Sequence, residues 1–215
     1  MKQLVDRIFL QNRDTREYEP ADLFHGIDET NLAHIEGRWR PMFELRRRQA
    51  TETGQSLSEI NAEDARWDWG KKALAAIDDP FLYDIFALEC GGNTQALLLT
   101  CKGGNDCFSR HTEHPKAHML YVEFLATAPW NRPGLVLNPT YRGAGMALMG
   151  TAVSLSLEEE MGGRLGLHSL PGAEVFYRDI VGMTDFGVDQ EGIHKGLRYF
   201  ELPGSQVNNF LTPQH

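Results

Sequence analysis

The spacing of apolar residues changes once along the chain, near Pro80. Before that point, apolar positions recur every three or four residues, as at Leu32, Ile35 and Trp39. This spacing is typical of one face of a helix. It returns further on at Trp69, Ala73 and Ala76. We therefore expect residues 1–80 to form a helical N-terminal part.

After Pro80 the pattern is that of a sheet. Five runs have the length and composition of strands: 81–90, 93–102, 117–129, 164–170 and 196–202. Gly91 and Gly92 separate the first two runs, and such a pair is typical of a hairpin turn. The third run is apolar on both faces, which indicates a central strand.

Two helical segments lie between the later strands. In residues 145–161, apolar side chains recur at helical spacing, and Gly162 and Gly163 follow directly, as expected at a helix end. Residues 172–183 predict a second, shorter helix. Helices that alternate with strands predict an α/β or α+β fold, with the helices packed on one sheet.

Composition narrows the class of protein. The net charge of −9 disfavours nucleic acid as a partner and favours cationic ligands. Three cysteines form no dense disulfide framework, and no apolar run has the length of a membrane helix or a signal peptide. We expect one domain, residues 1–215, in a cytoplasmic protein without a membrane partner.

The strongest chemical signal is a short run at the start of the 145–161 helix. It consists of Arg142, Gly143, Ala144, Gly145, Met146 and Ala147. The first turn of a helix carries amides with no internal partner, and small side chains let a phosphate approach them. Arginine adds a fixed cation suited to phosphate. An ordinary glycine-containing loop remains the alternative, because such short patterns also arise by chance.

The order Arg142-x-x-Gly145-x-Ala147 resembles the pyrophosphate-binding motif of the GNAT acyltransferase superfamily. The strand around residues 121–129 and the segment 163–183 resemble the parts of that family that flank the motif. The resemblance covers roughly residues 80–202. It implies a mixed, mostly antiparallel sheet with helices on both faces, and acetyl-coenzyme A (acetyl-CoA) held between two splayed strands. It also divides the chain into a helical part, a cofactor-binding core of 81–202 and a tail of 203–215.

The resemblance implies roles for particular residues. The backbone of Leu125, Ala126 and Thr127 is expected to bind the pantetheine arm, and Tyr177 is expected to protonate the leaving thiolate. A phenol of pKa about 10 is still protonated when a thiolate of pKa about 8.5 departs. A packed, hydrogen-bonded tyrosine is the alternative. Two departures from the family pattern are the long connection 129–141 and Met183 in place of an aromatic residue.

Two residues are candidates for the general base that deprotonates the acceptor amine. Glu123 lies within the apolar strand, where burial raises the pKa of a carboxyl group. Strand alternation predicts that it shares a face with Tyr121, Leu125 and Thr127. A structural ion pair is the alternative for Glu123. His168, at the end of the next strand, is the second candidate, although many such histidines serve only in a core.

One loop carries potential metal ligands, namely Cys101, Cys107, His111, His114 and His118. Their spacing fits no familiar zinc motif, so we predict no metal site. The loops 103–117 and 129–141 are expected to border the acceptor site, because variable loops carry specificity on a shared scaffold.

These inferences predict an N-acetyltransferase that moves an acetyl group from acetyl-CoA to a primary amine. The acceptor is an amine-bearing small molecule or protein, such as a polyamine, an aminoglycoside-like compound or a lysine side chain. A charged tRNA as acceptor and a homodimeric state stay open. A catalytically inactive acyl-CoA-binding sensor is the alternative, because a fold does not fix a function.

Overall fold

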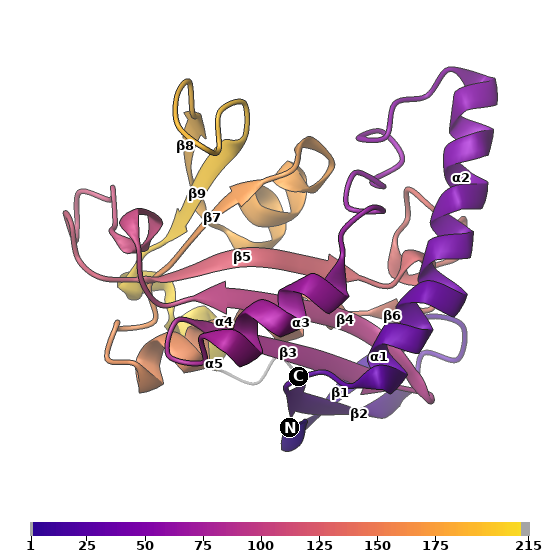
Figure 1. Ribbon diagram of the computed structural model, residues 1–215, viewed down its shortest axis with the longest axis horizontal. Coiled ribbons are helices and arrows are strands. Elements are labelled where there is room, and N and C mark those ends of the chain that lie inside the picture. Colours follow the sequence, from indigo (N-terminus) through magenta and orange to yellow (C-terminus); the bar gives the residue numbers. More distant parts are fainter. Residues whose placement is uncertain (1, 212–215) are drawn as a thin grey trace.

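The computed structural model describes residues 2–211, and within them it shows one nine-stranded sheet (Figure 1). The strand order is β6-β1-β2-β3-β4-β5-β7-β9-β8. The strands are β1 (Gln3–Asn12), β2 (Tyr18–His25), β3 (Tyr83–Cys90), β4 (Asn93–Cys101), β5 (Leu120–Thr127), β6 (Tyr141–Arg142), β7 (Leu165–Ser169), β8 (Thr184–Val188) and β9 (Arg198–Leu202). All neighbours pair antiparallel except β5 and β7, which confirms the mixed, mostly antiparallel sheet.

Helices cover both faces of this sheet. They are α1 (Glu29–His34), α2 (Arg40–Thr53), α3 (Trp69–Asp78), α4 (Ala144–Glu158) and α5 (Asn208–Leu211), with π-helical turns at Ile35–Trp39 and Phe176–Val181. One core cluster contains apolar residues of α4, and a second contains those of α2 and α3, with alternate residues of β3 and β4 divided between the two. The sheet therefore separates α4 from the N-terminal helices.

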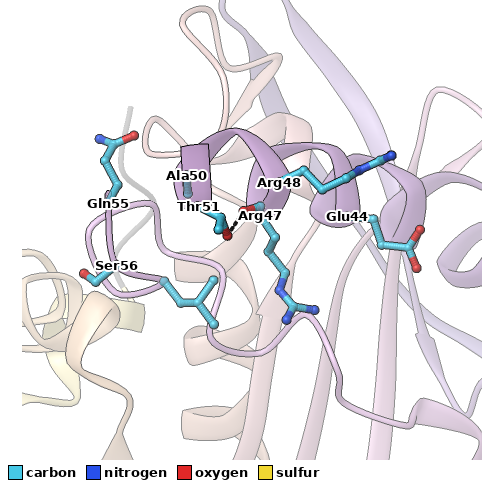
Figure 2. Close-up of a pocket in the computed structure, with 8 residues that line it drawn as sticks. Glu44, Arg47, Arg48, Ala50, Thr51, Gln55 and Ser56 are labelled. Atoms are coloured by element: carbon cyan, nitrogen blue, oxygen red, sulfur yellow. Dashed lines mark hydrogen bonds between the residues drawn. The ribbon is translucent and has the colours of Figure 1, made fainter. Parts of the chain in front are cut away.

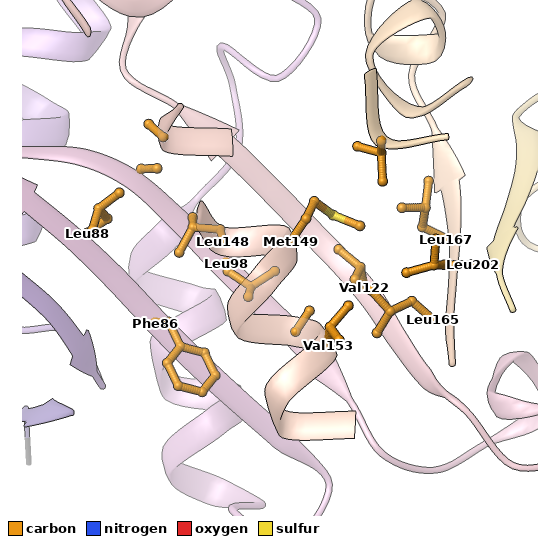
Figure 3. Packing of buried hydrophobic residues seen from close by; sticks show 14 of the residues in the cluster. Phe86, Leu88, Leu98, Val122, Leu148, Met149, Val153, Leu165, Leu167 and Leu202 are labelled. Atoms are coloured by element: carbon orange, nitrogen blue, oxygen red, sulfur yellow. The ribbon is translucent and has the colours of Figure 1, made fainter. Parts of the chain in front are cut away.

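The α4 side forms the larger core cluster (Figure 3). Leu148, Met149 and Val153 of α4 are fully buried between side chains of the central strands. Their partners from the sheet include Phe86, Leu88, Leu98, Val122, Leu165, Leu167 and Leu202. This packing fixes α4, and with it the position of its N-terminus, over the middle of the sheet.

The prediction of a wholly helical N-terminal part was wrong for its first third. Residues 3–25 form the hairpin β1–β2 at one side of the sheet, and helices begin only at Glu29. Most side chains of β1 are exposed, and Leu10 is its fully buried residue. Because this strand faces solvent over much of its length, its sequence lacks the apolar alternation that marks a buried strand.

The predicted strands after Pro80 are all present, and the hairpin β3–β4 turns at Gly91 and Gly92 as expected. Both glycines have positive φ, +58° and +69°, which is the backbone geometry of the favoured two-residue turn. Strand β8 was missed. It is an edge strand that contains Asp185 and Gly187, and its pairing with β9 is irregular.

Candidate active site

The central feature of the site is the divergence of β5 from β7. These parallel strands pair only at Leu120–Leu165 and Tyr121–Gly166, and beyond this point they separate (Figure 1). The pairing of β5 with β4 also shifts by one residue at Glu123, which has no partner in β4. A β-bulge of this kind bends the strand and re-aims a side chain.

The bulge divides the face that was predicted to hold Tyr121, Glu123, Leu125 and Thr127. After it, Leu125 packs against the α4 cluster, whereas Tyr121 belongs to a separate cluster with Met119 and Tyr199. Strict alternation would have placed Tyr121 and Leu125 on one face. Consecutive residues Leu99 and Thr100 of β4 pair with Phe124 and Val122 of β5, so Glu123 is an extra residue in β5. Side chains of β5 that follow it therefore point to the opposite face from the one that alternation predicts.

The larger of two cavities at this divergence has a volume of about 710 Å³ and begins at the N-terminus of α4. Residues 142–146, which belong to the segment predicted to bind phosphate, line it. Gly143 caps the helix with φ of +101°, a conformation that favours glycine. The amide of Ala147 already donates to the Gly143 carbonyl over 2.8 Å, so the amides available to a ligand are those before it.

Two arginines line the mouth of this larger cavity, Arg142 on β6 and Arg13 just after β1. Strands β1 and β6 pair at Gln11–Arg142, and the Arg13 amide donates to the Thr140 carbonyl over 2.8 Å. Neither guanidinium has an ion pair or hydrogen bond with any residue from 2 to 211. Sequence reasoning identified Arg142 but missed Arg13, which lies 129 positions earlier and joins the site only through this pairing.

The free edge of β5 forms another wall of the larger cavity. Leu125 and Thr127 line it, but Ala126 does not and packs in the cluster on the other face. The Ala128 amide donates to Gln95 of β4, so alternation turns the amides of Leu125 and Thr127 toward the cavity. The Thr127 carbonyl accepts from Arg132 Nε at 2.9 Å and Nη2 at 2.6 Å. Only part of the predicted backbone edge therefore remains for a ligand.

Arg132 is itself held by a buried ion pair. Its side chain is 6% exposed and makes two hydrogen bonds, of 2.7 and 2.6 Å, with the carboxylate of Asp64. A third bond, of 3.0 Å, reaches the Asn61 carbonyl. This network fastens the loop after β5 to the segment before α3, and it gives the long connection 129–141 a structural role.

Tyr177 lies where the two cavities meet. Tyr177 is 6% exposed and lines both cavities. Burial raises the pKa of its phenol above the ordinary value, so the hydroxyl is protonated at neutral pH. Within the described chain this hydroxyl makes no hydrogen bond, which leaves it available to a ligand.

The smaller cavity, of about 210 Å³, lies between β5 and the end of β7. Glu123, Tyr121, His168 and His194 line it. Burial is the main cause that raises the pKa of Glu123, and the nearby charge of His194 opposes this rise. No ion pair or hydrogen bond of the Glu123 carboxylate occurs within residues 2–211, which contradicts the structural ion pair considered for it.

His168 differs from Glu123 because both of its ring nitrogens are engaged. Nδ1 lies 2.7 Å from the Tyr121 hydroxyl, and Nε2 lies 2.9 Å from Asp189 Oδ2. Its side chain is 1% exposed, and burial is the main cause that lowers its pKa. His168 therefore lines the cavity with both ring nitrogens already engaged, whereas the Glu123 carboxylate has no such partner within residues 2–211.

In the cysteine- and histidine-rich loop, two cysteine thiols form hydrogen bonds to backbone carbonyls of the same segment. The Cys101 thiol donates to the Gly103 carbonyl, and the Cys107 thiol donates to the Cys101 carbonyl. Over the described part of the chain, no group of three or more His, Cys, Asp and Glu side chains is arranged to hold a metal ion.

A third hollow lies beside α2 and contains none of the predicted site residues (Figure 2). Arg47, Arg48 and Glu44 of α2 line it together with residues 55–57 of the following loop. The predicted site residues therefore lie at the β5–β7 divergence and not at this basic segment.

Among residues 2–211, no helix has the length and apolar character needed to cross a membrane.

The same architecture occurs in solved structures of GNAT acetyltransferases. A protein from Desulfovibrio desulfuricans that is assigned to the GNAT family is 11% identical, covers 86% of this chain and 99% of its own, and has a TM-score of 0.50. The GNAT domain of S. lividans PAT is 14% identical, covers 91% of this chain and 96% of its own, and also has a TM-score of 0.50. No family model matches the sequence, and no curated protein does so. The chain therefore has the GNAT fold.

Proposed function

We propose that this chain is an N-acetyltransferase that transfers the acetyl group of acetyl-CoA to a primary amine. The observation that carries the proposal is the junction at Tyr177. There, a large cavity with phosphate-binding features meets a small cavity that contains an unpaired carboxylate. A two-substrate reaction needs such a meeting point, where both reactants are held in contact.

The residues of the larger cavity fit acetyl-CoA. Arg142, Arg13 and the amides of residues 144–146 offer donors for phosphate groups, and the start of α4 adds partial positive charge. The outward amides of Leu125 and Thr127 can donate to the carbonyls of the pantetheine arm. This arrangement directs the thioester toward Tyr177.

The residues near the junction fit the chemistry of acyl transfer. An alkylammonium must lose a proton before it attacks, and Glu123 with its raised pKa is the better-placed base. His168 is the second candidate, acting through the Tyr121 hydroxyl. Attack forms the C–N bond, the C–S bond then breaks, and Tyr177 donates its proton to the departing thiolate.

The acceptor is a cationic amine, either on a small molecule or on a protein. The net charge of −9 favours the approach of polyamines, aminoglycoside-like compounds or lysine side chains. The segments after β7 and before β9, which line the smaller cavity at Leu170 and His194, would supply the finer selectivity.

Calorimetric titration with acetyl-CoA tests the cofactor half of the proposal. A Cβ atom at Gly145 would lie 3.1 Å from Phe176 Cζ, so Gly145→Glu crowds the helix start and adds a negative charge there. We expect Gly145→Glu to abolish binding. Gly150→Glu is the matched control in the same helix, because a Cβ at Gly150 meets nothing within 4 Å. Absence of binding by the unmodified protein would refute the proposal.

A further inference from the structure

A hydrogen-bonded chain ends at the smaller cavity and has no part in the principal reaction scheme above. Tyr121 Oη lies 2.7 Å from His168 Nδ1, and His168 Nε2 lies 2.9 Å from Asp189 Oδ2. Arg110 completes the chain with two bonds to the Asp189 carboxylate, of 2.7 and 2.8 Å. Strand β5, strand β7 and the loop after β8 thus converge on one tyrosine hydroxyl.

The charges along the chain fix the direction of each hydrogen bond. The bond to Arg110 is the main cause that holds the pKa of Asp189 well below its usual range, so this carboxylate only accepts. His168 Nε2 must then carry a hydrogen. Burial lowers the pKa of His168, so the ring is neutral and Nδ1 has a lone pair. The Tyr121 hydroxyl therefore donates to His168, and toward the cavity it offers only its oxygen lone pairs.

His194 makes only a long contact with this hydroxyl. Its ring stacks on His168 with the centroids 4.1 Å apart, and its Nε2 lies 3.4 Å from Tyr121 Oη and 3.3 Å from Asp106 Oδ2. Both contacts are long for hydrogen bonds. A phenol oxygen has two lone pairs, and a ligand would share them with His194 and with the His168 backbone amide, which also acts on this hydroxyl.

We propose that Tyr121, oriented by Asp189 and His168, forms with Glu123 the binding site for a primary alkylammonium acceptor. This inference rests on the proposed function and names the chemistry of its acceptor site. Both groups line the 210 Å³ cavity, and both present acceptors to it. A primary ammonium has three donors, an alcohol has one, and a quaternary ammonium has none. Two acceptors in one cavity therefore favour a primary ammonium over an alcohol or a quaternary ammonium.

The walls of the smaller cavity suit the alkyl part of such a ligand. Trp67 and Phe124 line it and form an edge-to-face pair with ring centroids 4.7 Å apart. An ammonium of the protein already lies against this pair, since Lys72 Nζ is 3.2 Å from the centroid of the Phe124 ring. The surroundings of the cavity thus accommodate a cation beside aromatic carbon.

A fragment titration followed by NMR tests the site without knowledge of the natural acceptor. The probes are n-propylammonium, 1-propanol and tetramethylammonium. We expect n-propylammonium to shift the ring resonances of Tyr121 and His168 in a saturable way, and the other two to leave them unchanged. Tyr121→Phe should weaken n-propylammonium binding about tenfold, the scale of one hydrogen bond to a charged group. Tyr83→Phe, on strand β3 and outside the lining of both cavities, is the matched control.

Asp189→Asn tests the orienting role separately. The amide can donate to His168 Nε2, which moves the ring hydrogen to Nδ1 and turns the Tyr121 lone pair inward. We expect the ring nitrogen shifts of His168 to report the other tautomer, with loss of n-propylammonium binding and unchanged affinity for acetyl-CoA. Equal binding by 1-propanol, or full binding by Tyr121→Phe, would overturn the proposal. So would binding that survives a demonstrated change of tautomer. Failure of acetyl-CoA to bind the unmodified protein would instead refute the proposed function, and the fragment result would still decide the amine site.

Discussion

The two cavities that meet at Tyr177 differ in how they present polar groups. The larger one offers backbone amides and two arginines without a side-chain partner among residues 2–211, which suit an anionic ligand of fixed shape. The smaller one offers a carboxylate and a tyrosine oxygen, which suit a cation. Backbone donors come with the fold, whereas the groups of the smaller cavity are side chains that sequence change can replace. On the proposed function, the larger cavity is the general cofactor side and the smaller one the specific acceptor side.

Loss of the Asp64–Arg132 pair should have the largest effect on the protein. Both side chains are under 10% exposed, and Asp64→Ala would leave Arg132 buried without its counterion. We expect a loss of about 3–5 kcal/mol in the free energy of unfolding. Denaturant titration measures it, with Glu52→Ala at an exposed position of α2 as the control. A loss below about 1 kcal/mol would show that the wall of the larger cavity does not depend on this pair.

Tyr177→Phe tests the junction itself. It removes the proton donor for the leaving thiolate but keeps the ring that both cavities share. We expect kcat to fall about 10²–10³-fold while acetyl-CoA affinity stays within about twofold. Thiol release measures kcat, with an acceptor found by screening polyamines, aminoglycosides and lysine peptides, and Tyr83→Phe is the control. An unchanged kcat would remove Tyr177 from the reaction and leave it as a packing residue.

The arginines at the mouth of the larger cavity sharpen the assignment of the cofactor side. Arg142→Gln should weaken acetyl-CoA binding about 10–100-fold, the scale of charge-assisted hydrogen bonds. Arg13→Gln should weaken it by a smaller factor. Arg142 directly precedes Gly143, which caps α4, whereas Arg13 follows the neighbouring strand β1. Calorimetry measures both affinities, and Arg48→Gln beside the α2 hollow is the control. Equal affinity for all three variants would place the phosphates elsewhere.

The sequence predicted those parts of the site that depend on local pattern. Strand β5, helix α4 and the turn that contains Gly143 follow from apolar spacing and small residues close together in the chain. The fold-level prediction also needed the likeness of these segments to one family. Parts that depend on pairing between distant segments were missed. Arg13 reaches the cavity only because β1 pairs with β6, and the engagement of His168 by Asp189 depends on the loop after β8.

The bulge at Glu123 is the clearest case of such a limit. A bulge is a mismatch between two strands, so β5 alone does not reveal it. Its consequence is that Tyr121 and Leu125 pack in different clusters, although plain alternation predicted one face for both. The meeting of Tyr121 and Glu123 could be predicted from β5 alone, whereas the placement of Leu125 could not.

Glu123→Gln should have the smallest effect on stability, and it bears most directly on the difference between the cavities. Since burial raises the pKa of Glu123, the folded state favours the protonated carboxyl, and this contribution to stability is lost as the pH rises through the folded-state pKa. At pH 8 a neutral Gln avoids the cost of a buried charge. We expect Glu123→Gln to raise the free energy of unfolding by about 1 kcal/mol at pH 8 and to change it little at pH 4, while it abolishes turnover. Thermal unfolding across this pH range measures the change. A destabilised variant at pH 8 would mean that the carboxylate is satisfied in the folded protein and is not a base that burial holds ready.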